Sequence, residues 1–404
     1  MRPLLSIIIP TKNRPDVAMA AVRQILSIPS ENLELIVRDT GESNALEERI
    51  RELEDSRFVY KHGPPVSALE NWNLAAEMAK GEYVCFIGDD DGVNPAIVSF
   101  VEWASRAGAD ALVSPYSAVY YWPDFPNRQY AGRLFLGKCS GEIRLLPAKR
   151  ELIRYIDSAR NPVRLLRIYH GTVRRDCLEE IRRRTGQYFH TPAFDDYISY
   201  MLCTLIDSYY FVDIPLTIAG KCKSSDSGLY AVSGNAREIL SFYRDEEKVL
   251  DRRAPPTAKV ESLKIDALVK ALQHGEAREL IGTIVDGQRY ASWYALSLRG
   301  SGSDAFLSIR HLWTSALQDR NFLGKIRIVV CVFVALAGHA FRKMRRMFIE
   351  LLGGYGLMIS GSDQQSVYAA GDIYEAASIV EQQVREQVNG SIGAVIRRKP
   401  HTVS

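Results

Sequence analysis

The sequence lacks the long apolar run that a membrane-spanning helix requires. About 18 consecutive apolar residues are needed to cross a bilayer, and no stretch of the 404-residue chain reaches that length. The apolar start, residues 1–9, is too short for a signal peptide and already contains Pro3. We therefore expect neither a transmembrane helix nor a cleaved leader.

Paired cysteines are also absent. The six cysteines are scattered and form no Cys-x-x-Cys motif. This argues against a zinc cluster and a disulfide framework, and it fits a reducing compartment such as the cytoplasm. The cysteines are Cys85, Cys139, Cys177, Cys203, Cys222 and Cys331.

The chain has little net charge. Its formal charge is +3, so composition gives no indication of a nucleic-acid partner. A hydrophobic content of 47% and a charged content of 25% are ordinary for a folded protein. The length allows two domains, or one domain with a large extension.

Strand and helix patterns alternate over the first part of the chain. Short apolar runs typical of buried strands occur at residues 4–9, 33–37, 58–60 and 83–87, with helical spacing between them. This β-α-β-α-β-α-β order predicts an α/β fold with a parallel or mostly parallel sheet and helices on its faces. A further strand is expected at residues 209–218.

Three consecutive carboxylates follow the run from Tyr83 to Ile87. Asp89, Asp90 and Asp91 repel one another, and buried acids are costly unless they are paired or metal-bound. The triplet therefore suits a hard divalent cation. Mg²⁺, for example, is usually bound by one or two protein carboxylates together with substrate phosphates. The alternative is a solvated acidic turn that ends the strand.

Polar clusters follow three of the predicted strands. Residues 11–14 follow the first strand, Asp39 the second, and residues 89–91 the fourth. Ligands in sheets of this kind bind at the carboxyl ends of the strands. The three clusters together therefore predict one binding site.

Four ordered segments resemble family 2 glycosyltransferases, which have the GT-A fold. They are Ser6–Arg14, Leu35–Gly41, Asn73–Tyr83 and Gly88–Asp91, the last in the place of the D-x-D motif. The resemblance covers about residues 4–215. Two departures stand out: Thr40 replaces a common Asp, and Gly88 replaces the usual first Asp of D-x-D.

The resemblance implies a nucleotide-sugar site and a bound Mg²⁺ or Mn²⁺. By motif position, Asp90 is the first candidate for a metal ligand and Asp91 the second, while Asp89 would contact sugar or ribose. The implied nucleotide-sugar-binding residues are Pro10, Thr11, Asn13, Arg14, Asp39, Asn71, Asp89 and Asp90.

Some of these residues have simpler alternatives. An Asp39 carboxylate can accept the N–H of a uracil-type base, but it is also a turn residue ahead of Gly41. Asn13 and Arg14 precede a helix that has Pro15 in its first turn, so they are helix-cap candidates as well.

A second acidic motif precedes the helix expected at residues 198–205. Asp195 and Asp196 resemble the family's catalytic acid pair, and inverting transfer needs one base to take the acceptor proton. Motif position favours Asp196 over Asp195. The alternative is a pair of acids that caps the helix.

Acceptor-side candidates are His170 and Trp122. His170 lies in a segment that borders the acceptor pocket in the family, and Trp122 belongs to an aromatic stretch, residues 116–130, that suits stacking on sugars. A structural histidine and a packed irregular loop are the alternatives.

We divide the chain into a GT-A domain at 1–220, a helical region at 221–358, and an amphipathic helix with a flexible tail at 359–404. Residues 326–346 combine the most apolar run with the basic cluster Arg342–Arg346, which suits an anionic membrane surface or a core helix ended by a basic turn. The amphipathic helix, residues 372–388, suits internal packing or a homo-oligomer contact.

The expected function is transfer of a sugar from a nucleotide-diphosphate donor, with UDP favoured, to a glycan or lipid-linked acceptor. The resemblance places it in cell-envelope polysaccharide or glycoconjugate synthesis, at the inner face of the cell membrane. A sugar nucleotidyltransferase is the first rival, although residues 10–14 lack the glycine of a phosphate loop. An inactive glycosyltransferase-like scaffold is the second.

Overall fold

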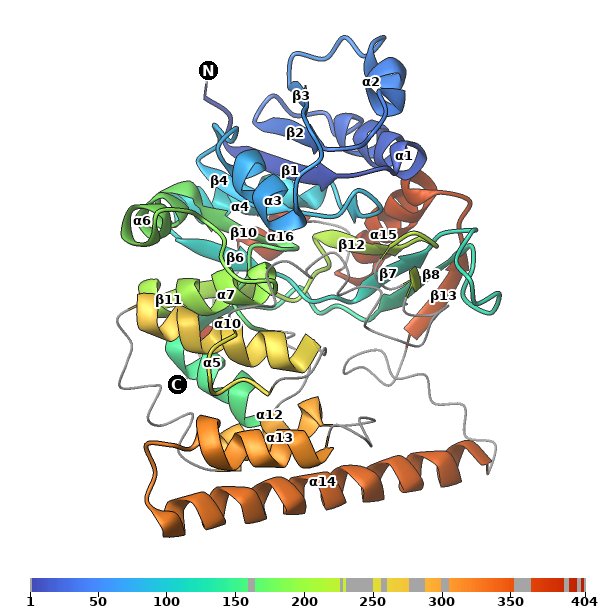
Figure 1. The fold of residues 1–404 in the computed structure, drawn as a ribbon. Coiled ribbons are helices and arrows are strands. Elements are labelled where there is room, and N and C mark those ends of the chain that lie inside the picture. Colours follow the sequence, from blue (N-terminus) through green and yellow to red (C-terminus); the bar gives the residue numbers. More distant parts are fainter. Residues whose placement is uncertain are drawn as a thin grey trace.

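The computed structural model describes residues 2–158, 164–225, 228–229, 250–255, 260–275, 288–298, 305–351, 365–388, 392–397 and 401–402. Two sheets and their helices form the upper part of the molecule in Figure 1, and a stack of helices forms the lower part. Most of residues 221–259 and residues 276–287 and 352–364 lie outside the described part, so the assignment of residues 221–358 to one region stays a prediction.

The alternation predicted for the amino-terminal part is confirmed. Strand β1 pairs in parallel with β2 and β4, and β2 pairs in parallel with β3. Because the strand order is β4-β1-β2-β3, the order reverses beside β1, where ligands bind in open α/β sheets. The elements are β1 Leu5–Thr11, α1 Pro15–Leu26, β2 Leu33–Asp39, α2 Ala45–Ile50, β3 Phe58–His62, α3 Ala68–Ala76 and β4 Tyr83–Phe86.

The same sheet continues beyond β4 to nine strands in the order β14-β9-β11-β6-β10-β4-β1-β2-β3. Strand β10 runs antiparallel to both β4 and β6, so the sheet is mostly, not wholly, parallel. The added strands are β6 Ala111–Val113, β9 Ile143–Pro147, β10 Gly171–Arg174, β11 Ser208–Val212 and β14 His401–Thr402. The accompanying helices are α4 Ala96–Arg106, α5 Ala148–Ser158, α6 Arg175–Thr185 and α7 Phe194–Leu205.

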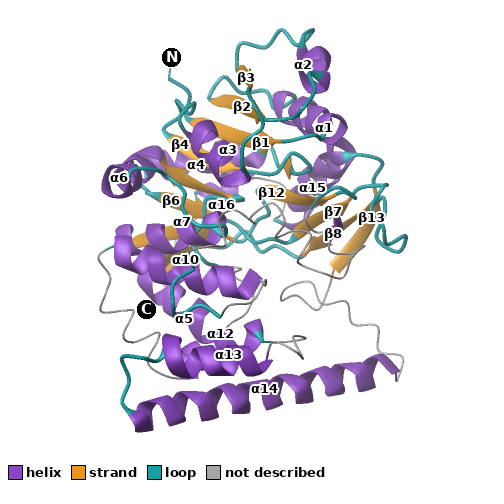
Figure 2. Ribbon diagram, viewed as in Figure 1, coloured by secondary structure: helices purple, strands orange, loops and turns teal. Residues whose placement is uncertain are grey.

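A second sheet of five strands has the order β13-β8-β7-β12-β5. The single strand expected at residues 209–218 is in fact two strands in two sheets, β11 and β12, separated at Ile214 and Pro215. The strands are β5 Gly92–Val93, β7 Ala118–Tyr121, β8 Arg133–Gly137, β12 Thr217–Lys221 and β13 Gln365–Ala369. Figure 2 shows them beside the helix-covered large sheet.

The apolar run of β1 is buried on both faces of the large sheet. Ile8 packs into one hydrophobic cluster together with Phe86, and Ile7 and Ile9 pack into another. This is the arrangement expected for a strand covered by helices on both sides. It makes the sheet a rigid support for the side chains at its carboxyl edge.

The carboxyl-terminal helices pack in a layer against α7 and α5. They are α10 Val260–His274, α12 Gln288–Ser297, α13 Ala305–His311, a short π-helix Leu312–Ala316 and α14 Phe322–Leu351. Helix α14 runs along the outer edge of this layer (Figure 1), with Ile328 and Val332 buried on its inner side. In the described part of the chain, no helix combines the length and apolarity that would carry it through a bilayer.

The last described segments return to the two sheets. Strand β13 pairs with β8, and β14 pairs with β9. The side chain of Ile373, the first residue of α15 (Ile373–Gln387), packs against Gly92. Residues 392–396 form α16, in which Val395 is buried. The apolar face of α15 is therefore used inside one chain, and a homo-oligomer contact through this helix stays a prediction.

Candidate active site

The three predicted polar clusters meet at the carboxyl edge of the large sheet. Thr11 and Asp39 are partners in the parallel register of β1 and β2. The Thr11 hydroxyl donates a hydrogen bond to the Asp89 carboxylate, although the two residues are 78 positions apart. The edge beside β1 therefore carries all three clusters, as the strand order requires.

Arg14 lies across the acid triplet. It is the residue before helix α1, yet its side chain makes no capping hydrogen bond, and neither does another side chain there. Its guanidinium Nη2 is instead 2.8 Å from Asp89 Oδ1, and Nη1 is 3.9 Å from Asp90 Oδ1. Burial raises the pKa of Asp89, and Arg14 and Thr11 oppose that effect.

Asn13 and Asp39 hold the loops around the site. The Asn13 amide oxygen accepts the backbone N–H of Glu42 at 2.8 Å, and its backbone φ is 57°. Asp39 is buried, with Oδ1 accepting the N–H of Gly41 at 2.7 Å and Oδ2 accepting the Tyr60 hydroxyl at 3.1 Å. The turn alternative for Asp39 is thus realised, while each oxygen keeps a further lone pair for a ligand.

Asn71 reaches the same edge from helix α3. Its amide nitrogen donates to the carbonyl oxygens of Thr11 and Arg38, each at 3.3 Å. Its side-chain oxygen is buried without a hydrogen-bond partner in the described part of the chain. Pro10 precedes these groups within β1 and is half-buried.

Asp91 is almost fully engaged by the protein. Oδ1 accepts the Gly220 N–H at 2.7 Å, and Oδ2 contacts the Gly88 N–H, the Tyr169 hydroxyl and His170 Nε2, the last two at 3.1 Å. Burial acts to raise the pKa of Asp91, but His170 and these N–H groups bring it below its usual range. Asp91 is therefore held as a carboxylate, with little capacity left for another ligand.

Asp90 has more capacity. Oδ2 accepts the Cys222 N–H at 3.2 Å, whereas the one partner of Oδ1 among the described residues is Arg14, at 3.9 Å. Burial, followed by the charge of Asp91, raises the pKa of Asp90 to about 7. A side chain at position 88 would place its Cβ 3.0 Å from Asp90 Oδ1 and from Asp91 Oδ2, which gives a steric reason for glycine there.

Trp122 and strand β12 fix the backbone of the triplet. Trp122 is buried, and its indole N–H donates to the Asp90 carbonyl at 2.9 Å. A Cβ at Gly220 would lie 1.7 Å from that same carbonyl oxygen, so only glycine allows β12 to approach. Trp122 thus supports the backbone of Asp90, and its acceptor-side role stays a prediction.

His170, also predicted on the acceptor side, lies in the interior. Its Nδ1 is 2.9 Å from the Thr217 hydroxyl, and its Nε2 contacts Asp91. The side chain is 2% exposed, and the backbone φ is 59°. The structure therefore places His170 where it orients Asp91.

Asp195 and Asp196 lie in the first turn of helix α7. Ala193, not an acid, is the residue that caps this helix, and Asp195 Oδ1 accepts the N–H of Asp196 at 2.9 Å. Asp196 Oδ1 accepts the Tyr200 hydroxyl at 3.3 Å, and Oδ2 is 3.4 Å from Lys264 Nζ. Burial raises the pKa of Asp196 to about 6, with Lys264 opposing the rise.

Tyr116 lies beside His170. Their ring centroids are 5.1 Å apart, the Tyr116 hydroxyl donates to the Tyr169 carbonyl at 3.1 Å, and the Arg167 guanidinium lies over the Tyr116 ring at 4.0 Å. Burial raises the pKa of the hydroxyl to about 12, with Arg167 opposing the rise and the charges of Asp195, Asp91 and Asp196 adding to it.

The acid triplet fits a divalent cation if substrate phosphates complete the site. No group of three His, Cys, Asp or Glu side chains in the described ranges encloses a point that could hold an ion. A site built with substrate phosphates needs only one or two protein carboxylates. Asp90 Oδ1, which accepts no hydrogen bond from the residues that the structure describes, meets that requirement, and Asp91 is its neighbour.

Two lysines at the site lie outside the predicted set. Lys221 follows Gly220 on β12, and burial lowers its pKa while Asp90 and Asp91 raise it. Lys264 comes from α10, 68 residues beyond Asp196. A lysine in an ordinary helical pattern carries no signal that would have identified it.

Comparison with known proteins adds a family and several relatives. Residues 6–156 match the family described as Glycosyl transferase family 2. WcaA of Escherichia coli (strain K12), named as a colanic acid biosynthesis glycosyl transferase, is 31% identical over 146 residues, covering 33% of this chain and 52% of that protein.

Two further relatives carry specific names. The UDP-Glc:alpha-D-GlcNAc-diphosphoundecaprenol beta-1,3-glucosyltransferase WfaP of Escherichia coli is 34% identical over 89 residues, covering 22% of this chain and 36% of that protein. The GalNAc(5)-diNAcBac-PP-undecaprenol beta-1,3-glucosyltransferase of Campylobacter jejuni is 34% identical over 97 residues, covering 22% of this chain and 30% of that protein. The chain thus spans about half or less of the length of these curated relatives.

Solved structures give a weaker likeness. A crystal structure of S. aureus TarS superposes with a TM-score of 0.42 at 15% identity, covering 80% of this chain and 50% of that chain. We draw nothing further from a likeness at this level.

Proposed function

Because residues 6–156 are a glycosyltransferase family 2 domain, we propose that the chain transfers a sugar from a nucleotide-diphosphate donor to a hydroxyl of a glycan or lipid-linked acceptor. The family match confirms the resemblance noted in the sequence, and with it the enzyme class, glycosyltransferase. It also disfavours the nucleotidyltransferase alternative. The donor, the metal, the stereochemistry and the acceptor are proposals.

The observation that carries the proposal is the convergence of Thr11 and Arg14 on the Asp89 carboxylate at the carboxyl edge of the sheet, within the segment that matches the family. We assign the donor to the sheet edge, where Asp39 and Asn71 offer acceptor atoms to a base and Asp89 offers one to sugar or ribose. Arg14 and Lys221 supply positive charge beside the place of the diphosphate. UDP is favoured because a carboxylate such as Asp39 can accept the uracil N–H and because one relative is named for a UDP-Glc donor.

A Mg²⁺ or Mn²⁺ ion held by Asp90, with Asp91 beside it, would offset the charge that develops on the departing diphosphate. The other steps belong to side chains of this chain. Trp122 and Gly220 fix the backbone that presents Asp90. His170 and Tyr169 hold Asp91 in one orientation.

Asp196 is the proposed base, with Asp195 as its neighbour and alternative. A carboxylate whose pKa is about 6 is ionised near neutral pH yet basic enough to accept a proton from an acceptor hydroxyl as it attacks. Direct attack from that side, with the nucleotide leaving on the other, would invert the anomeric centre. The positive end of the α7 helix dipole favours the ionised form.

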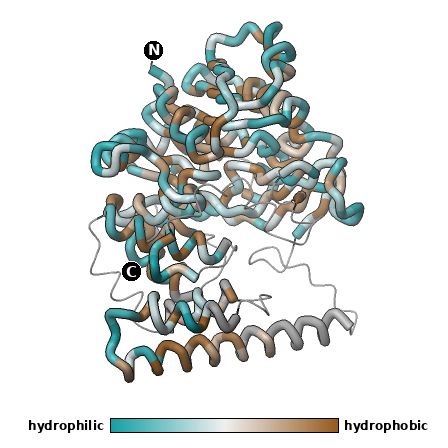
Figure 3. The backbone as a smooth tube through the Cα atoms, viewed as in Figure 1, coloured by the Kyte–Doolittle hydropathy of each residue, from teal (hydrophilic) through white to brown (hydrophobic). Residues whose placement is uncertain are grey.

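The acceptor would be lipid-linked, as the names of two relatives suggest, in polysaccharide or glycoconjugate synthesis. This proposal places the enzyme at the cytoplasmic face of a membrane. Helix α14 offers a surface for it, because several of its large apolar side chains are exposed, and the part of the helix that Figure 3 colours is mostly hydrophobic. The exposed fractions are 66% for Phe322, 75% for Leu323, 53% for Val330, 52% for Phe333, 65% for Val334 and 66% for Phe341.

Charge indicates what would cover this face. Between positions 322 and 349 the sequence has six lysines and arginines and no acid. Lys325 also lies over the Trp313 ring at 5.7 Å, which puts a cation and an aromatic ring at one end of the apolar stripe. An apolar stripe with only positive charges suits an anionic lipid surface, so we assign this face to the membrane.

Sedimentation of the full chain with vesicles tests the membrane assignment. Binding should require phosphatidylglycerol over phosphatidylcholine alone and should weaken with salt, since the attraction is partly electrostatic. Val334→Glu should reduce it several-fold, while Tyr374→Glu, at an exposed position on α15, should not. Equal binding by both variants would contradict the assignment, and concentration-dependent dimers lost in Val334→Glu would instead identify a self-association face.

Calorimetric titration of UDP, with and without Mn²⁺, tests the donor site. We expect metal-dependent binding that is lost in Asp90→Ala, because Asp90 supplies the carboxylate oxygen with the most free capacity. Metal-dependent binding of GDP or dTDP in place of UDP would correct the donor and keep the class. If no nucleoside diphosphate binds, the transferase proposal fails and the inactive scaffold takes its place.

A further inference from the structure

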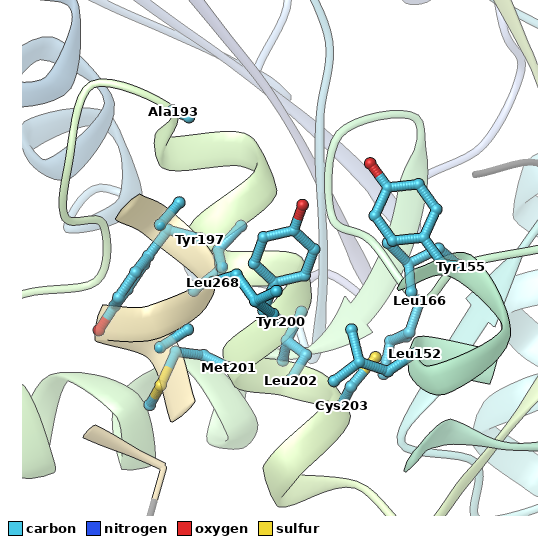
Figure 4. Close-up of a cluster of buried hydrophobic side chains, with 14 of the residues drawn as sticks. Leu152, Tyr155, Leu166, Ala193, Tyr197, Tyr200, Met201, Leu202, Cys203 and Leu268 are labelled. Carbon is cyan, nitrogen blue, oxygen red and sulfur yellow. The ribbon is translucent and has the colours of Figure 1, made fainter. Parts of the chain in front are cut away.

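The proposed base is contacted by a helix that lies outside the family-matched segment. Helix α10 packs along α7, and Leu268 joins the buried cluster that contains Tyr197 and Met201 (Figure 4). One helical turn before Leu268, Lys264 Nζ lies 3.4 Å from Asp196 Oδ2. The two side chains are 26% and 13% exposed, so water screens the pair only in part.

Lys264 is the cation that pairs with Asp196 among the described residues. The Tyr200 hydroxyl donates to Asp196 Oδ1 at 3.3 Å. Tyr155, on α5, has its hydroxyl at the same end of the cluster as that of Tyr200 (Figure 4). Asp195 precedes Asp196 and adds a second negative charge. Burial would lower the pKa of Lys264, but Asp196, Tyr155 and Asp195 outweigh burial and raise it.

We propose that Lys264 is a positioning residue for the base: its ammonium group fixes the Asp196 carboxylate and balances the negative charge of the acid pair. The inference rests on the proposed function, because it gives Asp196 the role of base. It also means that α10 completes the catalytic side of a site whose donor side is built elsewhere. Each Asp196 oxygen then has one partner, Tyr200 or Lys264.

A purely structural ion pair would join α10 to α7 without affecting catalysis. The two roles differ in their pH dependence. Asp196 has a pKa of about 6 with Lys264 beside it, so the active, ionised form should prevail above pH 6. Removing the ammonium group removes the charge that lowers this pKa, so the acidic limb of the activity profile should move to higher pH. A structural role would change thermal stability and leave the limb in place.

The test is the pH dependence of kcat and kcat/KM for the full chain, with UDP-glucose as donor and GlcNAc-diphosphoundecaprenol as acceptor. For Lys264→Met we expect the acidic limb to move up by about one pH unit and kcat below the limb to fall about tenfold, since one pKa unit is a tenfold change. The KM for UDP-glucose and the Kd for UDP should stay unchanged. Lys264→Arg should restore the limb, because arginine keeps the charge.

Lys270→Met is the matched control. Lys270 lies on the same helix and pairs with Asp266 at 2.9 Å, away from Asp196. It should change neither the limb nor kcat. Lys264→Gln is the second variant if Lys264→Met fails to fold, and thermal unfolding of each variant separates stability from catalysis.

Three results would overturn the inference. If the wild type is active and Lys264→Met or Lys264→Gln keeps the wild-type limb and kcat, Lys264 has no positioning role and the proposed function stands. A shift of equal size in Lys270→Met would show a general electrostatic effect. If the wild type binds no nucleotide and transfers no sugar, the proposed function fails and the role of Lys264 fails with it.

Discussion

Two groups of adjacent acids in the described part of the chain, one buried and one half-buried, are held by different kinds of partner. The triplet Asp89–Asp91 is held by Arg14, His170 and backbone N–H groups, all from elements at the edge of the sheets. The pair Asp195–Asp196 has its nearest cation on α10, in the carboxyl-terminal helical layer. Like charges at close range need such partners, because burial alone would protonate them.

The triplet is therefore held by groups at the edge of the sheets, whereas the acid pair depends on a helix of the carboxyl-terminal layer for its cation. The proposed donor side rests on a doubly covered sheet and on β12, which approaches through Gly220. The proposed catalytic side is shared between α7 and α10. Changes at the sheet edge should therefore affect nucleotide binding, and changes on α10 should affect the chemical step.

The largest effect is expected for Gly220→Ala. The added Cβ would meet the Asp90 carbonyl oxygen at 1.7 Å, and backbone cannot move aside without displacing the triplet. We expect a loss of about 3 kcal/mol in the free energy of unfolding, measured by denaturant titration, together with loss of UDP binding.

Gly371→Ala is the control for that change. Its Cβ would meet only Glu375, at 3.4 Å, an ordinary contact. It should leave stability and UDP binding unchanged. If Gly220→Ala behaves like Gly371→Ala, β12 does not form the tight wall of the donor side.

A smaller effect is expected for Trp122→Phe. The substitution keeps an aromatic ring but removes the indole donor, which leaves the buried Asp90 carbonyl without that hydrogen bond. Such a loss costs roughly 1–3 kcal/mol, and UDP affinity should fall because Asp90 loses its support. Trp103→Phe, on α4 beside Tyr210, offers a matched change away from the acids. Equal UDP affinity in the two variants would contradict this role of Trp122.

The smallest effects distinguish the two faces of α14. Val332 is 1% exposed and Val334 is 65% exposed, two positions apart on one helix. Val332→Ala should cost about 1.5 kcal/mol, from two buried methylene equivalents, and Val334→Ala less than about 0.5 kcal/mol. Thermal unfolding of both variants without lipid measures the difference. Equal losses would show that the outer face is packed in solution.

The fold and the donor edge could be predicted because local patterns determine them. Apolar runs that alternate with helical spacing led to the parallel sheet, and strand ends followed by polar residues led to Thr11, Asp39 and Asp89–Asp91. The strand expected at residues 209–218 failed as one element because the pattern did not show that Ile214 and Pro215 divide two sheets.

Contacts between the sheet-covering helices and the carboxyl-terminal helices could not be predicted. The sequence gives no indication that Lys264 lies against Asp196, because helical periodicity fixes a face but not the helix it meets. Trp122 was proposed for the acceptor side from an aromatic stretch and His170 from its place in the resemblance, and the structure shows both side chains buried, Trp122 against the Asp90 carbonyl and His170 against Asp91. The burial of Trp122 and His170, which their sequence context did not show, suits them to supporting Asp90 and Asp91.

The most direct test of the account is transfer of glucose from UDP-glucose to GlcNAc-diphosphoundecaprenol by the wild type and by Asp196→Asn, with UDP binding measured on the same samples. The account predicts that Asp196→Asn lowers kcat by about 10²–10⁴-fold, the range of general base catalysis, while the Kd for UDP changes little. Asp196→Asn with full activity, or with UDP binding lost together with activity, would contradict the division into a donor side and a catalytic side.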